Sequence, residues 1–542
     1  METSVFQAVM PAVTPRWLEA MMKQIVYCGL ALGLLLSACD RNDSDKSPEI
    51  PMDMMDEQFK AYLLENFDLD KDGTINMYEA DLVKEINIYH HTPFIYSLEG
   101  IQYFKNLEKL DCSRAQISTI DVSLNPALKT LICDNTNITE LDVSNNLALE
   151  TLSSNGNQTL QSLKLNPELK ILDISGHGMS SLDFRGNKYL KELTCSGANL
   201  LTLDVSQSDI SLLDCYGPTT LSYLNIDGCA SLKSLSFSSS VSVDLNNCPN
   251  LEKLRVGYSL DLDISPCKFL KYLHCINMSF NKLDLANFPD LEDLSLSYVR
   301  GDLTGISQNM QLQTLHLEST NLLFSPTEMT NHKKIKTITI LVGIIEIESL
   351  DFSGCTELEY LELYHRFTSL NVNGCTALTT LICRSSSIME INLKDNTSLS
   401  IFECNDGQLS ELNLEECTNL TDLSCRSNNL TNLKFANHTE LISLDCRSNK
   451  ITDIDLTGCQ SLKELLCYSN LLTTIDLSNS PLLYNINCRY NLIQPSLDLS
   501  QCKELNTVQC NSNPNLSELF IYRNHSIATL SKDQNTEIVL VD

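Results

Sequence analysis

The stretch Leu441-Ile-Ser-Leu-Asp-Cys446-Arg-Ser-Asn449-Lys-Ile-Thr-Asp-Ile-Asp-Leu-Thr-Gly-Cys459-Gln-Ser recurs along the chain with little change. The next copy begins at Leu462 and the preceding one at Leu420, so the period is 21 residues. In each copy, leucine and cysteine alternate with polar residues, and an asparagine follows three residues after the central cysteine. This alternation predicts a short strand whose apolar side chains all face one way.

Self-similarity at this period, with the pattern Leu-x-x-Leu-x-(Leu or Cys)-x-x-Asn, is the signature of leucine-rich repeats. Each repeat is one turn of a coil, and stacked turns bury a continuous core. The sequence therefore predicts an α/β-type solenoid, a leucine-rich-repeat horseshoe of about 20 repeats with parallel strands on its concave face. We assign the array to residues 107–515 and a C-terminal cap to 516–542.

We call the inward residue at the centre of each predicted strand its rung. The rungs follow one another at spacings of 19 to 23 residues, and 12 of the 20 are cysteine. In the less regular repeats between 218 and 370 they are mainly valine, leucine, phenylalanine or isoleucine. The rungs are Cys112, Cys133, Ser154, Ile174, Cys195, Cys215, Phe237, Val256, Cys275, Leu296, Leu317, Ile340, Leu363, Cys383, Cys404, Cys425, Cys446, Cys467, Cys488 and Cys510.

The remaining cysteines also follow the repeat. Of 22 in the chain, Cys28 and Cys39 precede the array, 12 are rungs, and eight lie eight residues before a rung. Asparagine takes that last position in other repeats, and both side chains can donate to a backbone carbonyl in a tight turn. Neighbouring parallel rungs offer poor disulfide geometry, so we predict free thiols. The eight are Cys229, Cys248, Cys267, Cys355, Cys375, Cys417, Cys459 and Cys502.

This in-register series of cysteines resembles the cysteine-ladder internalins, which are bacterial surface adhesion proteins. The resemblance covers most of residues 107–515, and it is closest from Leu378 to Asn513. It implies a surface protein that binds a macromolecule through its concave face.

The N-terminus predicts export. Residues 1–21 precede a second start at Met22 and are interpreted as an upstream extension, and residues 22–39 are predicted to be a signal peptide. Its apolar core of 12 residues is too short to span a bilayer. The following Leu36-Ser-Ala-Cys39 resembles the lipobox of bacterial lipoproteins, which implies lipidation of Cys39 and anchoring at the bacterial outer membrane or cell surface. The alternative is an ordinary signal peptide with a chance cysteine. Residues 40–56 are predicted to be a flexible tether.

Residues 68–79, Asp-Leu-Asp-Lys-Asp-Gly-Thr-Ile-Asn-Met-Tyr-Glu, match the whole EF-hand loop pattern. Calcium takes six to eight oxygen ligands, which a loop of this length supplies from alternate positions. The resemblance implies side-chain ligation by three aspartates, a backbone carbonyl, an asparagine acting directly or through water, and a bidentate glutamate. In that order the residues are Asp68, Asp70, Asp72, Thr74, Asn76 and Glu79.

Apolar residues at helical spacing flank this loop, so residues 57–90 are predicted to be a small helical, EF-hand-like cap. Residues 91–106 are predicted to be a half-repeat that joins this cap to the array. A single hand without a second one must bury its apolar face elsewhere, and the first repeat is adjacent. We therefore favour a structural calcium site that caps the array over a calcium sensor.

The residues directly after the rungs are predicted to face outward. Late in the array this column is rich in arginine and tyrosine, although the chain carries a net charge of −31. One interpretation is a binding surface for an anionic glycan or an acidic protein patch, because arginine and tyrosine are common interface anchors. The other is a solvated face whose charges are balanced internally by neighbouring carboxylates such as Glu362, Glu403 and Asp445. We call these residues the Arg/Tyr stripe: Tyr364, Arg384, Arg426, Arg447, Tyr468 and Arg489.

The composition and the absence of catalytic motifs favour binding over catalysis. An acidic chain argues against nucleic acid as a partner, and the nine histidines form no pattern with a nucleophile, a metal cluster or a phosphate loop. We predict a monomeric, non-enzymatic envelope lipoprotein that binds a protein or glycan and no small-molecule substrate. The alternatives are a purely structural envelope component and, less favoured, a hydrolase acting on a surface glycan.

Overall fold

The computed structural model describes residues 47–542 apart from short gaps. The predicted signal peptide, Cys39 and residues 40–46 of the tether lie outside the described residues. The chain divides into two compact units, Met1–Leu149 and Glu150–Asp542. In the described part, no helix has the length and apolar character needed to cross a membrane. The gaps are 90, 185, 218–220, 239–240, 242, 259–261, 320, 325–328, 342–348, 365 and 385–386.

The first unit begins with a two-helix module, α2 (Glu57–Phe67) and α3 (Met77–Leu82). Phe59 and Leu63 of α2 are buried. The ring centres of Phe67 and Phe104, the latter in the predicted half-repeat, are 6.4 Å apart. Strand β1 (Glu85–Asn87) follows α3 and pairs in parallel with β2 (Lys109–Asp111). The module is thus joined directly to the first repeat. This unit also contains η2 (Ile101–Tyr103), β3 (Thr130–Ile132) and β4 (Glu140–Asp142).

Residues 48–56, predicted as part of a flexible tether, instead pack against the helical module. Ile50, Met52 and Met55 are buried. The Ile50 N–H donates to the Ile75 carbonyl at 2.9 Å, and the Met77 N–H donates to the Pro48 carbonyl at 2.9 Å. The packing covers apolar side chains, including the buried Ile75, that would otherwise meet solvent.

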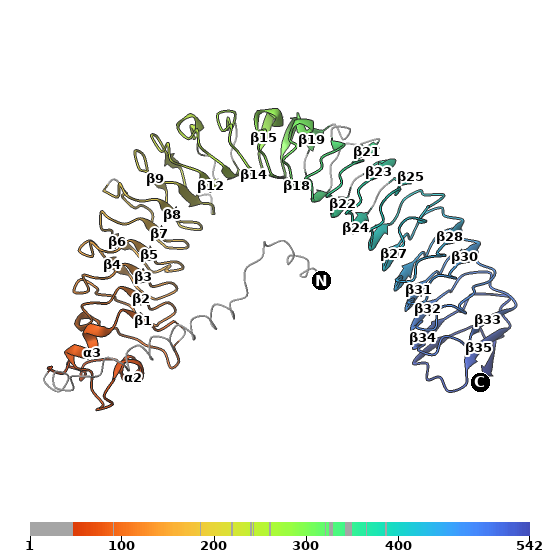
Figure 1. The fold of residues 1–542 in the computed structure, drawn as a ribbon, viewed down its shortest axis with the longest axis horizontal. Helices are drawn as coiled ribbons and strands as arrows, with labels where there is room; N and C mark the ends of the chain where they lie inside the picture. Colours follow the sequence, from red (N-terminus) through yellow and green to blue (C-terminus); the bar gives the residue numbers. More distant parts are fainter. Residues whose placement is uncertain are drawn as a thin grey trace, which may run out of the picture. The chain divides into compact units, whose positions relative to one another are not determined.

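The second unit confirms the predicted leucine-rich-repeat solenoid. One strand from each repeat joins a long parallel sheet, and equivalent residues stand side by side, as Leu444 does with Leu465. Within this unit the long sheet lies along the inner side of the arc (Figure 1). Its strands are β5 (Thr151–Ser153), β7 (Ile171–Asp173), β8 (Glu192–Thr194), β10 (Leu212–Cys215), β12 (Ser234–Ser238), β13 (Lys253–Gly257), β14 (Tyr272–Ile276), β16 (Asp293–Ser297), β18 (Thr314–Glu318), β20 (Thr337–Leu341), β22 (Tyr360–Tyr364), β24 (Thr380–Cys383), β26 (Ile401–Cys404), β27 (Asp422–Ser424), β29 (Ser443–Asp445), β31 (Glu464–Leu466), β32 (Asn485–Asn487), β34 (Thr507–Gln509) and β36 (Thr529–Ser531).

Many repeats carry a second strand on the outer side of the arc, which the sequence analysis missed (Figure 1). The available signal was a second alternation, as in Asn432-Leu433-Lys434, which is exposed, buried and exposed in turn. The middle repeats add η3 (Leu245–Asn247), η4 (Leu285–Asn287) and η5 (Ile306–Gln308). The outer strands are β6 (Ser162–Lys164), β9 (Thr202–Asp204), β11 (Tyr223–Asn225), β15 (Ser279–Asp284), β17 (Arg300–Thr304), β19 (Asn321–Phe324), β21 (Ser349–Asp351), β23 (Ser369–Asn371), β25 (Glu390–Asn392), β28 (Asn432–Lys434), β30 (Asp453–Asp455), β33 (Ser496–Leu499), β35 (Glu518–Tyr522) and β37 (Glu537–Val541).

The core confirms the predicted register of the rungs. All of them are buried except Cys215, which is partly exposed. The 20 cysteines of the described residues are free thiols. Burial raises the pKa of the Cys446 thiol well above its usual value, as it does for the neighbouring rungs.

The predicted exchange of cysteine and asparagine in the turns is also confirmed. The Cys375 thiol donates to the Phe352 carbonyl at 3.2 Å. In the next repeat, the Asn396 amide donates to the carbonyls of Val372 and Cys375 at 3.0 and 3.1 Å. His332 takes the same position and contacts the Ile306 carbonyl at 3.0 Å, which the sequence analysis did not anticipate.

The parallel pairing continues beyond residue 515, into the segment predicted as a C-terminal cap. Strand β36 pairs with β34, and β37 pairs with β35. The register places Lys532 opposite the last cysteine rung, because Gln509 pairs with Ser531. The coil thus continues with a lysine at the rung position.

Candidate functional site

The predicted calcium loop lies between α2 and α3. One carboxylate oxygen from each of Asp68, Asp70 and Glu79 lies within 4.8 Å of the other two. Gly73 turns the chain with φ +89°, a conformation that side-chain-bearing residues rarely adopt. The loop therefore brings together the first, second and last of its six predicted ligands.

The donor chemistry of this cluster fits calcium. One oxygen of Asp68 accepts the Gly73 N–H at 3.0 Å, whereas the other is buried and has no hydrogen-bond partner among the described residues. A buried carboxylate oxygen without a partner costs free energy, which a bound cation would offset. Oxygen ligands alone are what calcium prefers.

The other predicted ligands have roles within the loop itself. Asp72 lies outside the three-carboxylate cluster, and its Oδ1 accepts both the N–H and the hydroxyl of Thr74 at 2.8 Å. The Asn76 side chain accepts the N–H groups of Tyr78 and Glu79 at 3.0 and 3.1 Å, so it caps α3.

The Arg/Tyr stripe lies at the ends of strands of the long sheet in the second unit, and Asn405 takes the equivalent place between Arg384 and Arg426. At one end, Arg384 forms an ion pair with Glu403 at 2.7 Å, and this contact raises the arginine pKa. The same guanidinium hydrogen-bonds to the Tyr364 hydroxyl and lies 5.3 Å from the centre of that ring. Arg384 is thus balanced by a carboxylate, as the internal-compensation interpretation requires.

Tyr468 lies between two arginines at the other end of the stripe. Arg447 donates to its hydroxyl at 3.2 Å and lies 5.5 Å from its ring centre, and Arg489 lies 5.7 Å from the same ring. Arg447 also forms an ion pair with Asp445 at 3.1 Å. Burial raises the pKa of Asp445, and the positive charge of Arg447 opposes that rise.

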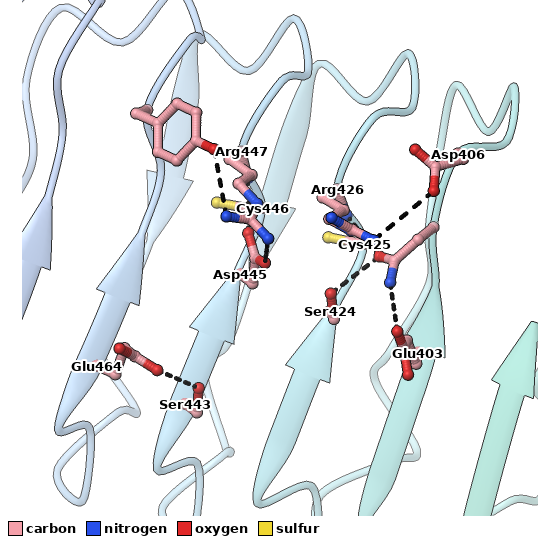
Figure 2. Close-up of polar contacts among 12 residues, drawn as sticks. Glu403, Asp406, Ser424, Cys425, Arg426, Ser443, Asp445, Cys446, Arg447 and Glu464 are labelled. Carbon is pink, nitrogen blue, oxygen red and sulfur yellow. Dashed lines mark hydrogen bonds and ion pairs between the residues drawn. The ribbon is translucent and has the colours of Figure 1, made fainter. Parts of the chain in front are cut away.

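Two arginines of the stripe are poorly balanced by carboxylates. Arg426 reaches Asp406 only at 3.9 Å (Figure 2). Arg489 bonds to the neutral Asn487 at 3.1 Å, and no ion pair joins it to any carboxylate in the described ranges. Figure 2 shows Arg426 and Arg447 just beyond the ends of the neighbouring strands β27 and β29, with Cys425 and Cys446 beside them. The stripe is therefore partly compensated, with surplus positive charge at Arg426 and Arg489.

The middle repeats hold further cation–aromatic contacts that the sequence analysis missed. Arg255 stacks on Tyr216, with 3.9 Å from the guanidinium to the ring centre, and Lys253 lies 4.7 Å from the centre of the Tyr272 ring. The irregular spacing of these repeats hid their alignment. His274 contacts Asp293 at 2.7 Å on a neighbouring strand.

Comparison with known proteins supports the fold. No protein-family model matches the sequence, and no curated protein matches it either. Among solved structures, YopM from Yersinia enterocolitica is 18% identical, with 85% of this chain and 91% of that chain covered and a TM-score of 0.54. A TDR receptor is 15% identical, with 82% and 86% covered and a TM-score of 0.60.

The functional domain of InlJ from Listeria monocytogenes, which includes a cysteine ladder, also matches. It is 21% identical, with 86% of this chain and 79% of that chain covered and a TM-score of 0.37. At such identities these likenesses concern the fold alone. The likenesses to YopM and to the TDR receptor, together with the strand pairing described above, show that this chain has a leucine-rich-repeat solenoid fold.

Proposed function

We propose that this protein is a non-enzymatic, lipid-anchored component of a bacterial cell envelope that binds an acidic protein surface through the Arg/Tyr stripe. The observation that carries the proposal is the packing of Tyr468 between Arg447 and Arg489. Side chains that are already held in place lose less conformational entropy when a partner binds. Arginine and tyrosine are also the residues that most often dominate binding energy at interfaces.

Charge favours an acidic partner. Arg426 and Arg489 carry positive charge that nearby carboxylates balance weakly or not at all. On a chain with a net charge of −31, such a patch would select partners by electrostatic complementarity. The structural likeness to a TDR receptor adds fold-level analogy for ligand binding, which is weaker support than the site itself.

We further propose that the loop at 68–79 holds a structural calcium ion. Asp68, Asp70 and Glu79 would supply carboxylate oxygens, Thr74 would supply its backbone carbonyl, and Asp72 and Asn76 would act directly or through water. The buried, unpartnered oxygen of Asp68 supports this assignment. The ion would stiffen the loop that joins the two helices next to the first repeat.

The lipid anchor at Cys39 is proposed from the lipobox alone. Mass spectrometry of the purified protein would detect the acyl chains, and Cys39→Ser should abolish them. Protease treatment of intact cells would then test exposure. Loss of the chain supports a surface binding role, whereas protection supports the alternative of a structural envelope component.

The binding proposal is tested with a defined acidic probe. A fluorescent oligo-glutamate peptide should bind the wild-type protein, and Arg426→Glu with Arg489→Glu should weaken binding at least tenfold, about 1.4 kcal/mol. The matched control is Lys394→Glu with Lys434→Glu, which makes the same charge change away from the stripe. Both lysines are exposed; Lys394 follows the outer strand β25, and Lys434 ends the outer strand β28. Equal weakening in both variants, or no binding to the wild type, would contradict the stripe. Heparin binding that is lost in the first variant would assign the stripe to an anionic glycan.

A further inference from the structure

The turn that follows each rung holds a tyrosine in three repeats. Two residues after the rung the backbone adopts positive φ, and glycine, asparagine, serine or aspartate usually stands there, as at Gly176 and Ser448. Tyrosine stands there at Tyr258, Tyr298 and Tyr490, with φ of 59°, 57° and 54°. A bulky residue in this region is strained, because its Cβ crowds the following carbonyl.

Packing does not offset the free-energy cost of this backbone strain at Tyr258 and Tyr298. The two residues are 49% and 51% exposed. The ring–ring and cation–ring contacts of the described residues do not include either of them. Backbone strain that no packing contact offsets is a reason to look for a functional role.

These two tyrosines stand in line, with Asn277 between them. The Tyr258 N–H donates to the Ile276 carbonyl and the Asn277 N–H donates to the Ser297 carbonyl, both at 2.9 Å. Tyr258, Asn277 and Tyr298 therefore occupy equivalent places on three neighbouring turns, which we call the tyrosine row. Adjacent parallel strands are about 4.8 Å apart, so the two tyrosine backbones stand roughly 10 Å apart along the sheet.

We propose that the tyrosine row binds an extended, neutral glycan chain. The exposed face of each tyrosine ring can stack on the C–H face of a sugar, since aromatic faces attract partial positive charge. The exposed Asn277 amide, with one acceptor and two donors, can bond to hydroxyls between the stacked sugars. Beside the row stand the uncharged Gly257, Ser279 and Ser297 and one residue of each charge, Arg300, which pairs with Ser279, and Glu318, which accepts a hydrogen bond from the Ser297 hydroxyl at 3.1 Å. This setting differs from the cationic stripe and favours a neutral polymer over an acidic one.

The test is affinity electrophoresis in native gels that contain a soluble xylan, an α-linked glucan or a mannan. At least one of these polysaccharides should retard the wild-type protein. Tyr258→Asn with Tyr298→Asn should weaken that interaction at least tenfold. The same variant should melt at an unchanged or higher temperature, because asparagine tolerates positive φ better than tyrosine. A purely structural role would instead lower the melting temperature.

Two controls separate this site from the rest of the molecule. Tyr490→Asn removes a tyrosine that is equally strained and exposed. Serines, not tyrosines, stand at the same place in the adjoining turns, at Ser469 and Ser512. This variant should therefore leave retardation unchanged. Arg426→Glu with Arg489→Glu should also leave it unchanged, so the stripe can fail independently of the tyrosine row. The proposal is overturned if none of the three polysaccharides retards the wild type, if the double tyrosine variant is retarded equally, or if its melting temperature falls. Loss of oligo-glutamate binding in that variant would assign the tyrosines to a protein ligand, and would overturn it as well.

Discussion

The guanidinium of Arg447 donates to the hydroxyl of Tyr468 at 3.2 Å and lies 5.5 Å from the centre of its ring, one repeat away. Arg489 approaches the same ring from the next repeat. Three successive turns thus share one aromatic side chain, which fixes the positions of two positive charges. Repetition makes this possible, because equivalent residues on parallel strands stand side by side.

Replacing Tyr468 should test whether its ring positions the arginines. Tyr468→Ala should weaken binding of the oligo-glutamate probe about tenfold, near 1.4 kcal/mol, because both arginines lose their shared contact. Tyr468→Phe keeps the ring and should cost less than about a third of that free energy, since it removes one hydroxyl contact of modest strength. Fluorescence anisotropy titrations of the two variants give the comparison. Equal weakening by both would show that the hydroxyl, not the ring, matters.

Calcium should stabilise the first unit through the loop at 68–79. At a free concentration 100 times the dissociation constant, a bound ion adds about 2.7 kcal/mol to the free energy of unfolding. Glu79→Gln and Asp68→Asn should remove this gain, because each weakens a ligand of the cluster. The measurement is thermal unfolding with calcium and with a chelator.

Asp53→Asn is the matched control for the calcium variants, because Asp53 is exposed and lies outside the loop. Residues 48–50 give a second readout, since they bond to the backbone of Ile75 and Met77 in the loop. Chelation should speed proteolysis near Pro48 in the wild type and leave it unchanged in Glu79→Gln. A wild type whose unfolding and proteolysis ignore calcium would refute the site.

The contrast between the rungs and the stripe shows what could be predicted from sequence. The register of the rungs follows from the repeat length alone. Leu444 and Leu465 are 21 residues apart and therefore pair on neighbouring parallel strands. The partners of the arginines follow no period. Arg384 finds Glu403 on the next strand, Arg447 finds Asp445 on its own strand, and Arg426 reaches only toward Asp406. Such contacts depend on side-chain reach, which a column of residues does not reveal.

The docking of residues 48–56 was unpredictable for a related reason. Ile50, Met52 and Met55 are buried, but they stand among prolines and acidic residues without helical or strand spacing. The loop was easier to recognise, because the ligand positions of a calcium site follow a fixed spacing. Its surroundings, including the unpartnered Asp68 oxygen, required coordinates.

The turn position eight residues before each rung should distinguish a hydrogen bond from simple filling of space. Cys375→Ala leaves the Phe352 carbonyl without its 3.2 Å thiol donor and should cost about 1 kcal/mol of stability. Cys375→Asn should cost less, because Asn396 makes two such bonds at the equivalent place in the next repeat. Chemical denaturation gives the order of the two variants. A larger loss for asparagine than for alanine would show that volume, not donation, governs the turn.

The buried thiols should make the array sensitive to alkali. Burial raises the pKa of Cys355 and Cys510 to about 11 and of Cys459 and Cys502 to about 12, whereas a thiol in the unfolded chain has a pKa near 8.5. Between these values the folded state binds more protons than the unfolded state, so stability falls as pH rises. Below about pH 8.5 the thiols contribute no pH dependence. Above it, each contributes up to about 1.4 kcal/mol per pH unit until its folded pKa is reached.

Melting temperatures measured from pH 7 to 11 should therefore decline once the pH passes about 9, as thiols ionise on unfolding. Cys446→Val tests the cause, because valine already serves as a rung at Val256 and has no proton to lose. This variant should show a shallower decline than the wild type, whatever its stability at neutral pH. Lysine and tyrosine also titrate in this range, but the substitution leaves them unchanged. An identical slope in the two proteins would mean that those groups, and not the thiol of Cys446, set the alkaline limit.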